Sequence, residues 1–474
     1  MASFLSVGID IGTSTTQVIF SRIEMENTGG YFSVPRVSIV DKQIVFKSRI
    51  YLTPLKNPIL IDGPAVRELV AGAYKEAGYT PADVNTGAVI ITGESARKEN
   101  AAEVLGQLSD FAGEFVVSTA GPDLESIIAG KGSGAYQYSI DNACTAVNLD
   151  IGGGTTNLVM FKDGDVIAKG CLDIGGRLIR LDEDLMVTYI SPAAKAVADA
   201  VGVSIGVGYR TGYEKLERIT DKMADLLAQA LGAKMQEGLL YRIQTPESSW
   251  FAASDPIRAI CFSGGVADCI AEQPYGIPYG DIGLLLGRSI ARNTMLKQYK
   301  CILGSETIRA TVVGAGTYTT SISGSTIDYA KGLLPLKNIP ALKLSAQEES
   351  ACFSANTGEL RQKMRWFMGQ SASELIALAM TGRQDPDYPA VRRLAEYLAE
   401  EMDAALPPEK PIIVILEHDM AKVLGMTMRN RLGERRKVIC LDSIKVEQGD
   451  YVDLGRPVLD GMVIPIVVKT LLFG

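Results

Sequence analysis

Two short segments of this chain place an aspartate before a turn of glycine and hydroxyl residues. Asp10 begins the segment DIGTSTTQVIFS, and Asp150 begins DIGGGTTNLVMF, so that Asp, Ile, Gly, Thr and Thr fall in the same register. Glycine lets the backbone approach a ligand closely, and successive N–H groups and hydroxyls can converge on an anion. A carboxylate that ends the preceding strand can hold a hydrated cation. Two such turns in facing lobes would grip one magnesium polyphosphate from opposite sides.

Each turn alone is also compatible with an ordinary β-hairpin, because Gly and Thr are common in turns. A hairpin does not need an aspartate at its opening, however. The repetition of Asp10 as Asp150 therefore favours a pair of phosphate loops and a nucleotide ligand.

The elements around the two turns alternate between strand-like and helix-like patterns. Up to residue 139 the expected strands are 5–11, 17–23, 43–52 and 88–92, and the expected helices are 63–77, 96–108 and 123–130. The next segment continues with a strand at 165–171, a helix at 212–231 and a short strand at 259–262. This alternation predicts an α/β fold.

The pattern changes beyond residue 345, where the polar stretch SAQEES precedes expected helices at 371–381 and 391–406. A strand–helix pair at 412–432 and strands at 438–442 and 463–472 complete the chain, which predicts a third lobe. Its basic cluster is typical of a solvated face. The cluster consists of Arg429, Arg431, Arg435, Arg436 and Lys437.

Length and charge restrict the function classes. A chain of 474 residues is too long for one core and suits two or three domains. The net charge of −8 argues against a general binder of nucleic-acid backbones. The amino terminus reads as a first strand, and no apolar run approaches the roughly 20 residues that cross a bilayer, so we expect no membrane partner. Seven dispersed cysteines without C-x-x-C spacing indicate reduced thiols in a cytoplasmic protein.

The sequence lacks the motifs that several other kinds of active site require. The chain has one histidine, His418, which excludes a His-based zinc site and leaves a Ser-His-Asp triad dependent on one ring. The sequence contains no P-loop, no strand followed by G-x-G-x-x-G and no G-x-S-x-G elbow. His418 lies between a strand and a helix, where a structural role is expected.

The order of these motifs resembles a known superfamily. A first phosphate hairpin, a second hairpin in the next lobe and the later turn Ser263-Gly264-Gly265 resemble the actin-like ATPases and sugar kinases over residues 5–330. The stretches IITGESARKENA from Ile90, STAGPDLESIIAGKGSGA from Ser118 and GDYVDLGRPVLDG from Gly449 are similar to the reactivating factors of ethanolamine ammonia-lyase. That likeness runs the full length of the chain.

The resemblance implies an actin-like (ribonuclease H-like) α/β fold with duplicated ATPase lobes and an additional C-terminal α/β region. The C-terminal region would suit the docking of a protein partner. The domains expected on this basis are lobe I at 1–139, lobe II at 140–313, a hinge segment that returns to lobe I at 314–345, and the C-terminal region at 346–474.

The resemblance also implies an activity. Such factors use ATP and Mg²⁺ to release inactivated cobalamin from ethanolamine ammonia-lyase, so that intact adenosylcobalamin can bind again. The chain lacks the D-x-H-x-x-G pattern of direct cobalamin binding, so the corrinoid is expected on the partner. Family likeness adds an association with a bacterial microcompartment to the cytoplasmic location. Whether the protein forms a homo-oligomer or needs a small subunit stays open.

The resemblance also implies a role for each residue of this chain that matches a family motif. Asp10 and Asp150 would order water bound to Mg²⁺ or the attacking water, and Glu94 would either position water or cap a helix. Ser263, Gly264 and Gly265 would lie against the adenosine. The residues expected to reach the phosphates are Gly12, Thr13, Ser14, Thr15 and Thr16 from one side and Gly152, Gly153, Gly154, Thr155 and Thr156 from the other.

Two other functions remain open at this point. A sugar or carboxylate kinase would use the same lobes with a catalytic aspartate in the second lobe, for which Asp173 is the candidate. A nucleotide-binding scaffold or filament protein would keep the hairpins without turnover, because hydrolysis also requires an accurately placed water.

Overall fold

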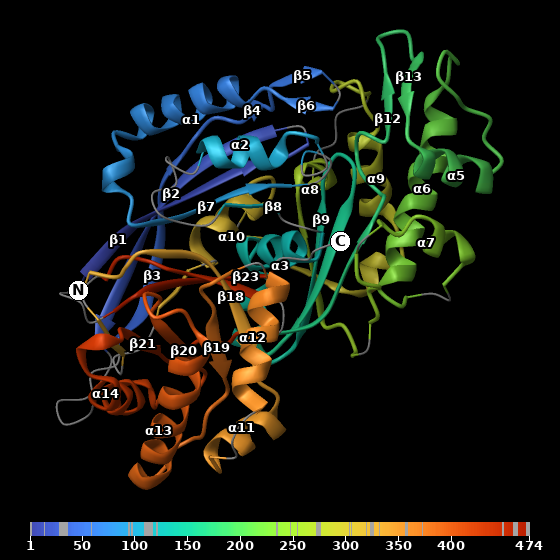
Figure 1. Ribbon diagram of the computed structural model, residues 1–474. Coiled ribbons are helices and arrows are strands. Elements are labelled where there is room, and N and C mark those ends of the chain that lie inside the picture. Colours follow the sequence, from blue (N-terminus) through green and yellow to red (C-terminus); the bar gives the residue numbers. More distant parts are fainter. Residues whose placement is uncertain are drawn as a thin grey trace.

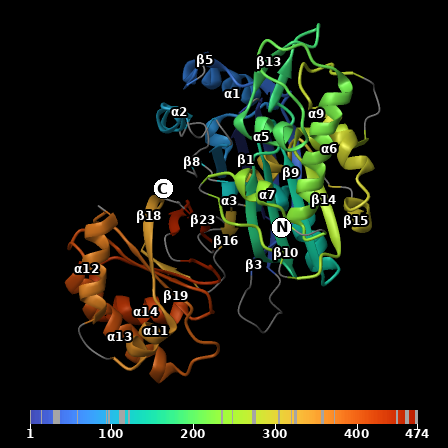
Figure 2. The ribbon, with the colours of Figure 1, turned by 90° about the vertical axis from the view of Figure 1, so that its right-hand side faces the viewer.

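The described chain forms two similar α/β lobes and a third α/β body beside them (Figures 1 and 2). The computed structural model describes residues 2–470 apart from 14, 28–36, 58, 93–94, 96–97, 109–116, 120–121, 234–235, 247, 254, 272–275, 303, 305, 319, 323–326, 331, 356–358, 372, 448–449 and 458–462. Within these residues, none of the helices combines the length and the apolar character needed to span a membrane.

The first lobe is built around the central strand β1. This strand pairs antiparallel with β2 and parallel with β7, in the order β3-β2-β1-β7-β8. Its apolar side chains Val7, Ile9 and Ile11 pack under helices α1 and α2. The elements are β1 (Ala2–Ile11), β2 (Thr15–Asn27), β3 (Val37–Lys47), β4 (Tyr51–Leu52), β5 (Leu55–Asn57), β6 (Leu60–Ile61), α1 (Gly63–Ala77), β7 (Thr86–Ile91), α2 (Ala101–Leu108) and β8 (Val117–Thr119).

The second lobe repeats this topology. Its sheet has the order β11-β10-β9-β14-β15, with β9 in the position of β1 and β10 in that of β2. The repeated order confirms the duplicated, actin-like α/β arrangement. The elements are α4 (Ala135–Asp141), β9 (Thr145–Ile151), β10 (Thr156–Lys162), β11 (Asp165–Leu172), β12 (Ile179–Leu181), β13 (Val187–Ile190), α5 (Pro192–Ala200), α6 (Tyr213–Ala230), α7 (Gly238–Arg242), β14 (Ala259–Ser263), α8 (Gly265–Ala271), α9 (Gly283–Arg292) and β15 (Lys300–Ile302).

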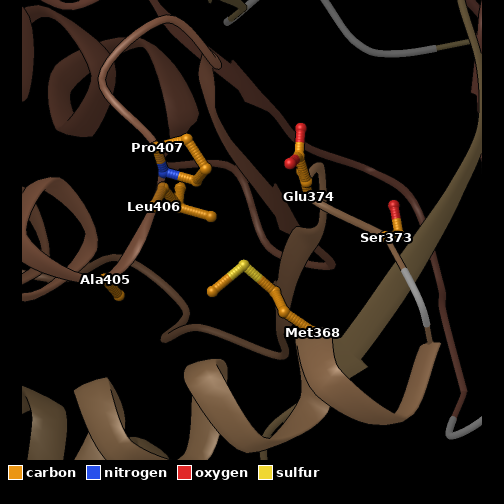
Figure 3. Close-up of a pocket in the computed structure, with 6 residues that line it drawn as sticks. All are labelled: Met368, Ser373, Glu374, Ala405, Leu406 and Pro407. Carbon is orange, nitrogen blue, oxygen red and sulfur yellow. The ribbon is translucent and has the colours of Figure 1, made fainter.

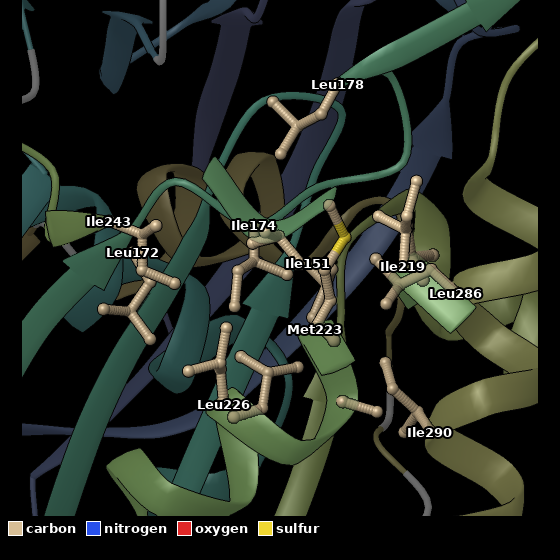
Figure 4. Packing of buried hydrophobic residues seen from close by; sticks show 14 of the residues in the cluster. Ile151, Leu172, Ile174, Leu178, Ile219, Met223, Leu226, Ile243, Leu286 and Ile290 are labelled. Carbon is tan, nitrogen blue, oxygen red and sulfur yellow. The ribbon is translucent and has the colours of Figure 1, made fainter. Parts of the chain in front are cut away.

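A large apolar core fixes the second turn in place. Ile151, the residue after Asp150, is fully buried and packs in one cluster with Ile174, Met223 and Leu286 from three other segments (Figure 4). Each of these side chains contributes about 1.5–3 kcal/mol when it is fully buried. The phosphate turn of the second lobe therefore extends from a rigid base.

Two helices cross between the lobes, α3 (Pro122–Gly132) and α10 (Ala310–Tyr318). Helix α3 lies on the second sheet, where the Ser126 hydroxyl donates to the Gly170 carbonyl of β11. Helix α10 lies on the first sheet, against Ile19. The helices touch through glycines, since a Cβ on Gly132 would lie 1.8 Å from the Ala310 carbonyl and one on Gly314 would lie 2.0 Å from the Ile128 carbonyl. Helix α3, which lies before residue 139, therefore packs on the sheet of the second lobe, and the boundary at 139 stays a prediction.

The third body contains one mixed sheet, in the order β16-β23-β22-β18-β19-β20-β21-β17. The strands β18 to β21 are parallel, and helices α11 to α14 cover them (Figure 2). The sheet already includes residue 320, which lies before the expected start at 346. The elements are β16 (Thr320–Ile322), β17 (Asp328–Tyr329), β18 (Leu336–Lys343), α11 (Ala346–Phe353), α12 (Glu359–Ser371), β19 (Ala377–Met380), α13 (Tyr388–Ala405), β20 (Ile412–Leu416), α14 (Ala421–Leu432), β21 (Val438–Leu441), β22 (Asp450–Leu454) and β23 (Pro465–Thr470).

One expectation for the third body was wrong, and another holds only in part. The segment 371–381 is not a helix, because it contains the buried strand β19, whose sequence ALAM sits between two parallel neighbours. A short apolar run cannot be distinguished from a helix by periodicity alone. The basic cluster is mostly a solvated face, with Arg431, Arg435 and Lys437 exposed. Arg436 is the exception, because it is buried, donates to the Leu406 carbonyl at 2.9 Å and pairs with Asp403.

Candidate functional site

A cavity of about 430 Å³ lies between the two lobes, and both aspartate turns line it. This volume is typical of a small-molecule site. Helix α3 and the start of α10 complete its walls. The lining residues are Asp10, Gly12, Thr13, Thr15, Gln17, Leu52, Thr92, Glu125, Asp150, Gly152, Gly153, Gly154, Thr155, Gly176, Arg177, Gly264, Gly265, Val266, Asp268, Cys269, Tyr279, Asp281, Gly283, Ile308 and Thr311.

The two turns have the same backbone geometry. The Gly12 N–H donates to the Thr15 carbonyl at 2.9 Å, and the Gly152 N–H donates to the Thr155 carbonyl at 2.9 Å. Across each hairpin the aspartate stands opposite an amide residue, Gln17 in the first lobe and Asn157 in the second. The sequence repeat therefore corresponds to a repeat in three dimensions.

Asp10 is buried at the end of β1. Burial raises the pKa of its carboxyl to about 7, a hydrogen bond from Thr92 acts in the opposite direction, and the charge of Asp150 raises it further. The Thr92 hydroxyl donates to Asp10 Oδ1 at 3.0 Å. Without a cation nearby, this carboxyl is therefore only partly ionised near neutral pH.

Asp150 occupies the equivalent position at the end of β9. Burial raises its pKa to about 6, and hydrogen bonds from Ser263, Asn157 and Thr311 limit the increase. The Ser263 hydroxyl donates to Asp150 Oδ1 at 2.6 Å and accepts from the Asn148 side-chain amide at 2.9 Å. A relay of neutral groups thus fixes the orientation of this carboxylate.

A third loop secures the second turn from behind. The Gly176 N–H donates to the Gly152 carbonyl at 3.0 Å, and the Arg177 N–H donates to the Gly153 carbonyl at 2.7 Å. Because these carbonyls are engaged by backbone donors, the turn cannot shift without moving the loop that carries Arg177.

The Gly264-Gly265 turn follows β14 and starts α8 on the second-lobe side of the cavity. Gly264 has φ = 82°, and a Cβ at this position would lie 2.4 Å from the Ile151 carbonyl. Only glycine fits here. The missing Cβ lets this turn pack against the end of β9, and both glycines line the cavity.

Some predicted residues do not line the cavity. Ser14 and Glu94 lie outside the described residues. Thr16 is buried beside the Thr53 hydroxyl at 3.1 Å, and the Thr156 hydroxyl donates to the Ile174 carbonyl at 2.7 Å. Successive side chains of a strand point to opposite faces, so Thr15 and Thr155 face the cavity while the next residue of each pair does not. Ser263 acts one step away, through Asp150.

Sequence reasoning missed several lining residues. Glu125, in the first turn of α3, and Arg177, in the third loop, are ionisable side chains on the cavity wall. The acid-rich start of an expected helix within STAGPDLESIIAG was a signal for Glu125, whereas nothing local distinguished Arg177. Asp173 does not line the cavity and accepts a hydrogen bond from the Thr245 hydroxyl at 2.7 Å.

The donor set fits a hydrated divalent cation with a polyphosphate. No group of three or more His, Cys, Asp or Glu in the described part of the chain is arranged to hold a metal directly. Two buried carboxylates that face one cavity suit Mg²⁺, which usually retains several water ligands. Gln17 lines the same cavity and has a buried Oε1 without a hydrogen bond, an acceptor that such a bound water could satisfy.

A second hollow lies in the third body and differs in character. This open depression of about 420 Å³ is lined by Met368, Ser373, Glu374, Ala405, Leu406 and Pro407 (Figure 3). Its one ionisable lining residue, Glu374, pairs with Lys410 at 3.2 Å and is largely exposed. Without converging polar groups, the depression offers no chemistry comparable to that of the cavity between the lobes.

Comparisons with known sequences match nearly the whole chain. A family model described as ethanolamine utilisation protein EutA matches residues 2–474. The ethanolamine ammonia-lyase reactivase EutA of Salmonella typhimurium is 36% identical, and the alignment covers 99% of this chain and 98% of that protein. The reactivase of the same name from Escherichia coli is 36% identical with the same coverage. Among solved structures, the type II variant of the Aquifex aeolicus Ppx/GppA phosphatase gives a TM-score of 0.40 at 14% identity, over 66% of this chain and 99% of that chain.

Proposed function

This chain belongs to the ethanolamine utilisation protein EutA family, and from that premise we propose that it is an ATP-dependent reactivating factor of ethanolamine ammonia-lyase. In this function, ATP hydrolysis drives the release of inactivated cobalamin from the lyase, and intact adenosylcobalamin then binds. The observation that carries the proposal is the single cavity lined by both Asp10 and Asp150 turns and by the Gly264 turn.

The lining residues suggest a division of roles. The N–H groups and hydroxyls of Gly12 to Thr15 and of Gly152 to Thr155 would bind the phosphates, and Gly264 would lie against the adenosine. Asp10 and Asp150 would hold the water ligands of Mg²⁺. When bound, this cation neutralises charge that develops on the transferred phosphoryl group.

Glu125 is the candidate for orienting the attacking water. It lines the cavity from the first turn of α3, and an ionised carboxylate only accepts hydrogen bonds. In hydrolysis the water oxygen would bond to the γ-phosphorus, the bond from this phosphorus to the β–γ bridging oxygen would break, and a proton of the water would pass to Glu125. Glu94 remains a second candidate from the sequence.

The crossing helices provide a route from the nucleotide to the partner. Thr311, in the first turn of α10, lines the cavity, and β16 follows this helix at residue 320 as an edge strand of the third sheet. A nucleotide that binds the closed arrangement of the lobes more tightly than the open one would shift the population toward closure. Movement of α10 would then reach the third body, which we assign to docking of the lyase.

The deciding experiment combines inactivated lyase holoenzyme with this protein, ATP, Mg²⁺ and fresh adenosylcobalamin. We expect deaminase activity to return with ATP and not with a non-hydrolysable ATP analogue. Phosphorylation of a small sugar or acid without recovery of the lyase would favour the kinase. The position of Asp173 outside the cavity argues against its role as the kinase base.

A scaffold without turnover is distinguished by phosphate release. The purified protein, with or without the lyase, should release phosphate from ATP in a Mg²⁺-dependent manner. Tight ATP binding with no phosphate release above the buffer background, even with lyase present, would favour the scaffold.

A further inference from the structure

The cavity between the lobes is strongly acidic for a site that should hold a triphosphate. Five carboxylate residues line it, against one cationic residue among the described lining residues, Arg177. A bound triphosphate adds several negative charges, and like charges repel strongly where water is excluded. The position of Arg177 therefore matters for any anionic ligand. The five carboxylates are those of Asp10, Glu125, Asp150, Asp268 and Asp281.

The backbone of Arg177 is fixed at the phosphate end of the site. Its N–H donates to the carbonyl of Gly153, the central glycine of the second turn, at 2.7 Å. The Gly264 turn, assigned to adenosine, is a separate segment of the wall. A long guanidinium side chain that starts beside Gly153 can therefore reach the phosphate groups.

The side chain of Arg177 is held only loosely in the nucleotide-free protein. Its Nε lies 3.5 Å from Asp281 Oδ2, and its side chain is 36% exposed. A charge-assisted N–H···O bond of full strength is about 2.7–2.9 Å long. Arg177 is itself partly in water, so it stays hydrated when it turns away, and the cost of breaking the pair falls on the buried Asp281.

Asp281, in contrast, is held by a second contact. Its Oδ1 accepts a hydrogen bond from the Gly283 N–H at 2.9 Å, at the start of α9. Burial raises the pKa of Asp281, and the charges of Arg177 and Arg180 oppose that increase. Asp281 thus stays at the start of α9 when Arg177 moves away.

We propose that Arg177 is a phosphate-binding switch, paired with Asp281 in the nucleotide-free protein and turned to the γ-phosphate when a nucleoside triphosphate occupies the cavity. The inference rests on the proposed ATPase function and adds a residue to it. A guanidinium binds phosphate oxygens through two parallel N–H groups, which suits stabilisation of the transition state as well as binding. When Arg177 exchanges Asp281 for the γ-phosphate, the contact between Arg177 and the start of α9 is lost, so the surroundings of α9 would differ between the ATP-bound and ADP-bound protein.

The test compares the full-length wild type with Arg177→Ala, Arg177→Lys and Arg180→Ala. Arg180 is the control for charge alone, because its charge also acts on Asp281 but its exposed side chain lies over the Tyr189 ring and does not line the cavity. Binding of ATP and ADP is measured by calorimetry with Mg²⁺, and phosphate release is measured in parallel. Circular dichroism and the unfolding midpoint establish that each variant is folded.

We expect Arg177→Ala to reduce phosphate release by about 100-fold, as for the loss of one hydrogen-bond donor to a transition state. Its affinity should fall about tenfold for ATP and less than about threefold for ADP, since a lost charge-assisted bond acts only where the γ-phosphate is present. Arg177→Lys should be intermediate, because an ammonium cannot form the two parallel bonds. Arg180→Ala should change phosphate release and ATP affinity by less than about threefold, because it removes a charge near Asp281 but no side chain of the cavity wall.

Two results would overturn the switch. One is a folded Arg177→Ala protein that binds ATP and ADP and releases phosphate as the wild type does. The other is an equal loss in Arg180→Ala, which would indicate a general effect of positive charge. A wild type that binds no ATP would instead overturn the ATPase proposal from which the inference starts.

A second variant tests the resting contact. Asp281→Asn removes the charge that holds Arg177, while the amide oxygen can still accept from the Gly283 N–H. We expect ATP affinity to increase by about threefold, since a weak competing ion pair is lost. An affinity reduced as far as in Arg177→Ala would contradict the exchange of partners.

Discussion

The two aspartate turns share one backbone geometry but have different supports. Asp10 receives a 3.0 Å hydrogen bond from Thr92, and its pKa is raised to about 7. Asp150 receives a 2.6 Å hydrogen bond from Ser263, which is itself oriented by Asn148, and its pKa is raised to about 6. Both carboxyls are buried; Asp150 receives more hydrogen bonds, and its charge raises the pKa of Asp10, so both effects place the pKa of Asp10 above that of Asp150.

The groups that donate hydrogen bonds to the backbone carbonyls also differ between the two turns. Backbone N–H groups of Gly176 and Arg177 hold the second turn, whereas the Gly12 carbonyl of the first turn accepts from the side chains of Thr53 at 2.8 Å and Ser95 at 3.0 Å. The second turn is thus the rigid anionic anchor, and the first is the adjustable half that titrates near neutral pH. The repeated sequence therefore preserves the backbone geometry of the turn, while the two aspartates differ in their pKa and in the groups that hold their turns.

The largest effect should come from removing either carboxylate. We expect Asp150→Asn and Asp10→Asn to reduce Mg²⁺-dependent phosphate release by about 100-fold or more, with the greater loss in Asp150→Asn, because each removes charge stabilisation of the transition state. Phosphate release is measured at saturating ATP. Asp165→Asn, an exposed change in the same lobe, is the control. Equal rates in all four proteins would refute the paired site.

The glycine turns provide the second test. Gly264→Ala should destabilise the fold by about 3 kcal/mol or more, because its Cβ would lie 2.4 Å from the Ile151 carbonyl oxygen and its φ is positive. Gly154→Ala is the matched variant, since a Cβ there meets nothing within 4 Å. Urea unfolding compares the two proteins with the wild type. A Gly264→Ala protein as stable as Gly154→Ala would mean that the turn relaxes.

The sequence predicted the local features of the fold better than their assembly. The helix at 63–77 and the repeated hairpins were correct, because each depends on local chemistry, such as the Asp62 side chain that accepts from Ala65 N–H at the helix start. The strand β19 was missed because its four residues favour either state until its neighbours bury it. The place of α3 on the second sheet depends on contacts between distant segments, which no local pattern contains.

The sequence likewise predicted some site residues, whereas others come together only in the folded chain. Asp10, Asp150 and the glycines were identifiable because their spacing repeats, and the structure brings them to one cavity. Thr16 and Thr156 belong to the same motifs, but strand alternation directs them into the protein. Arg177 and Asp281 are far apart in sequence and meet only through folding of the third loop against α9. Their pairing could not be predicted from the sequence.

A smaller effect should appear in the stability of the nucleotide-free protein. The folded-state pKa of Asp10 lies above 3.8, the ordinary value for an aspartate, so the folded state holds the proton more tightly than the unfolded state. Wild-type stability should therefore fall as pH rises from about 4 to 7 and then level off. Asp10→Asn cannot lose a proton, so it should become more stable than the wild type by about 1–3 kcal/mol at pH 8.

Urea unfolding in EDTA at pH 5 and pH 8 measures this difference. Asp165→Asn, which keeps Asp10, should lose stability between pH 5 and pH 8 as the wild type does, and Mg²⁺ with ATP should stabilise the wild type more than Asp10→Asn. A constant difference between wild type and Asp10→Asn across this range would show that Asp10 does not titrate near neutrality.

The smallest effect should separate the supports of the two carboxylates. Thr92→Val and Ser263→Ala each remove one hydrogen bond to an ionised group, worth about 1.5–3 kcal/mol at most. Ser263→Ala should raise the acidic midpoint of Mg²⁺-dependent phosphate release by about one pH unit, and Thr92→Val should raise it by about half a unit. The larger shift is expected for Ser263→Ala because the Ser263 hydrogen bond is shorter and its hydroxyl is oriented by Asn148. The measurement is the pH profile of phosphate release at subsaturating Mg²⁺. At pH 8, where both carboxyls are ionised, both variants should approach the wild-type rate. A larger shift for Thr92→Val than for Ser263→Ala would reverse the order of the two turns and make the first one the anchor.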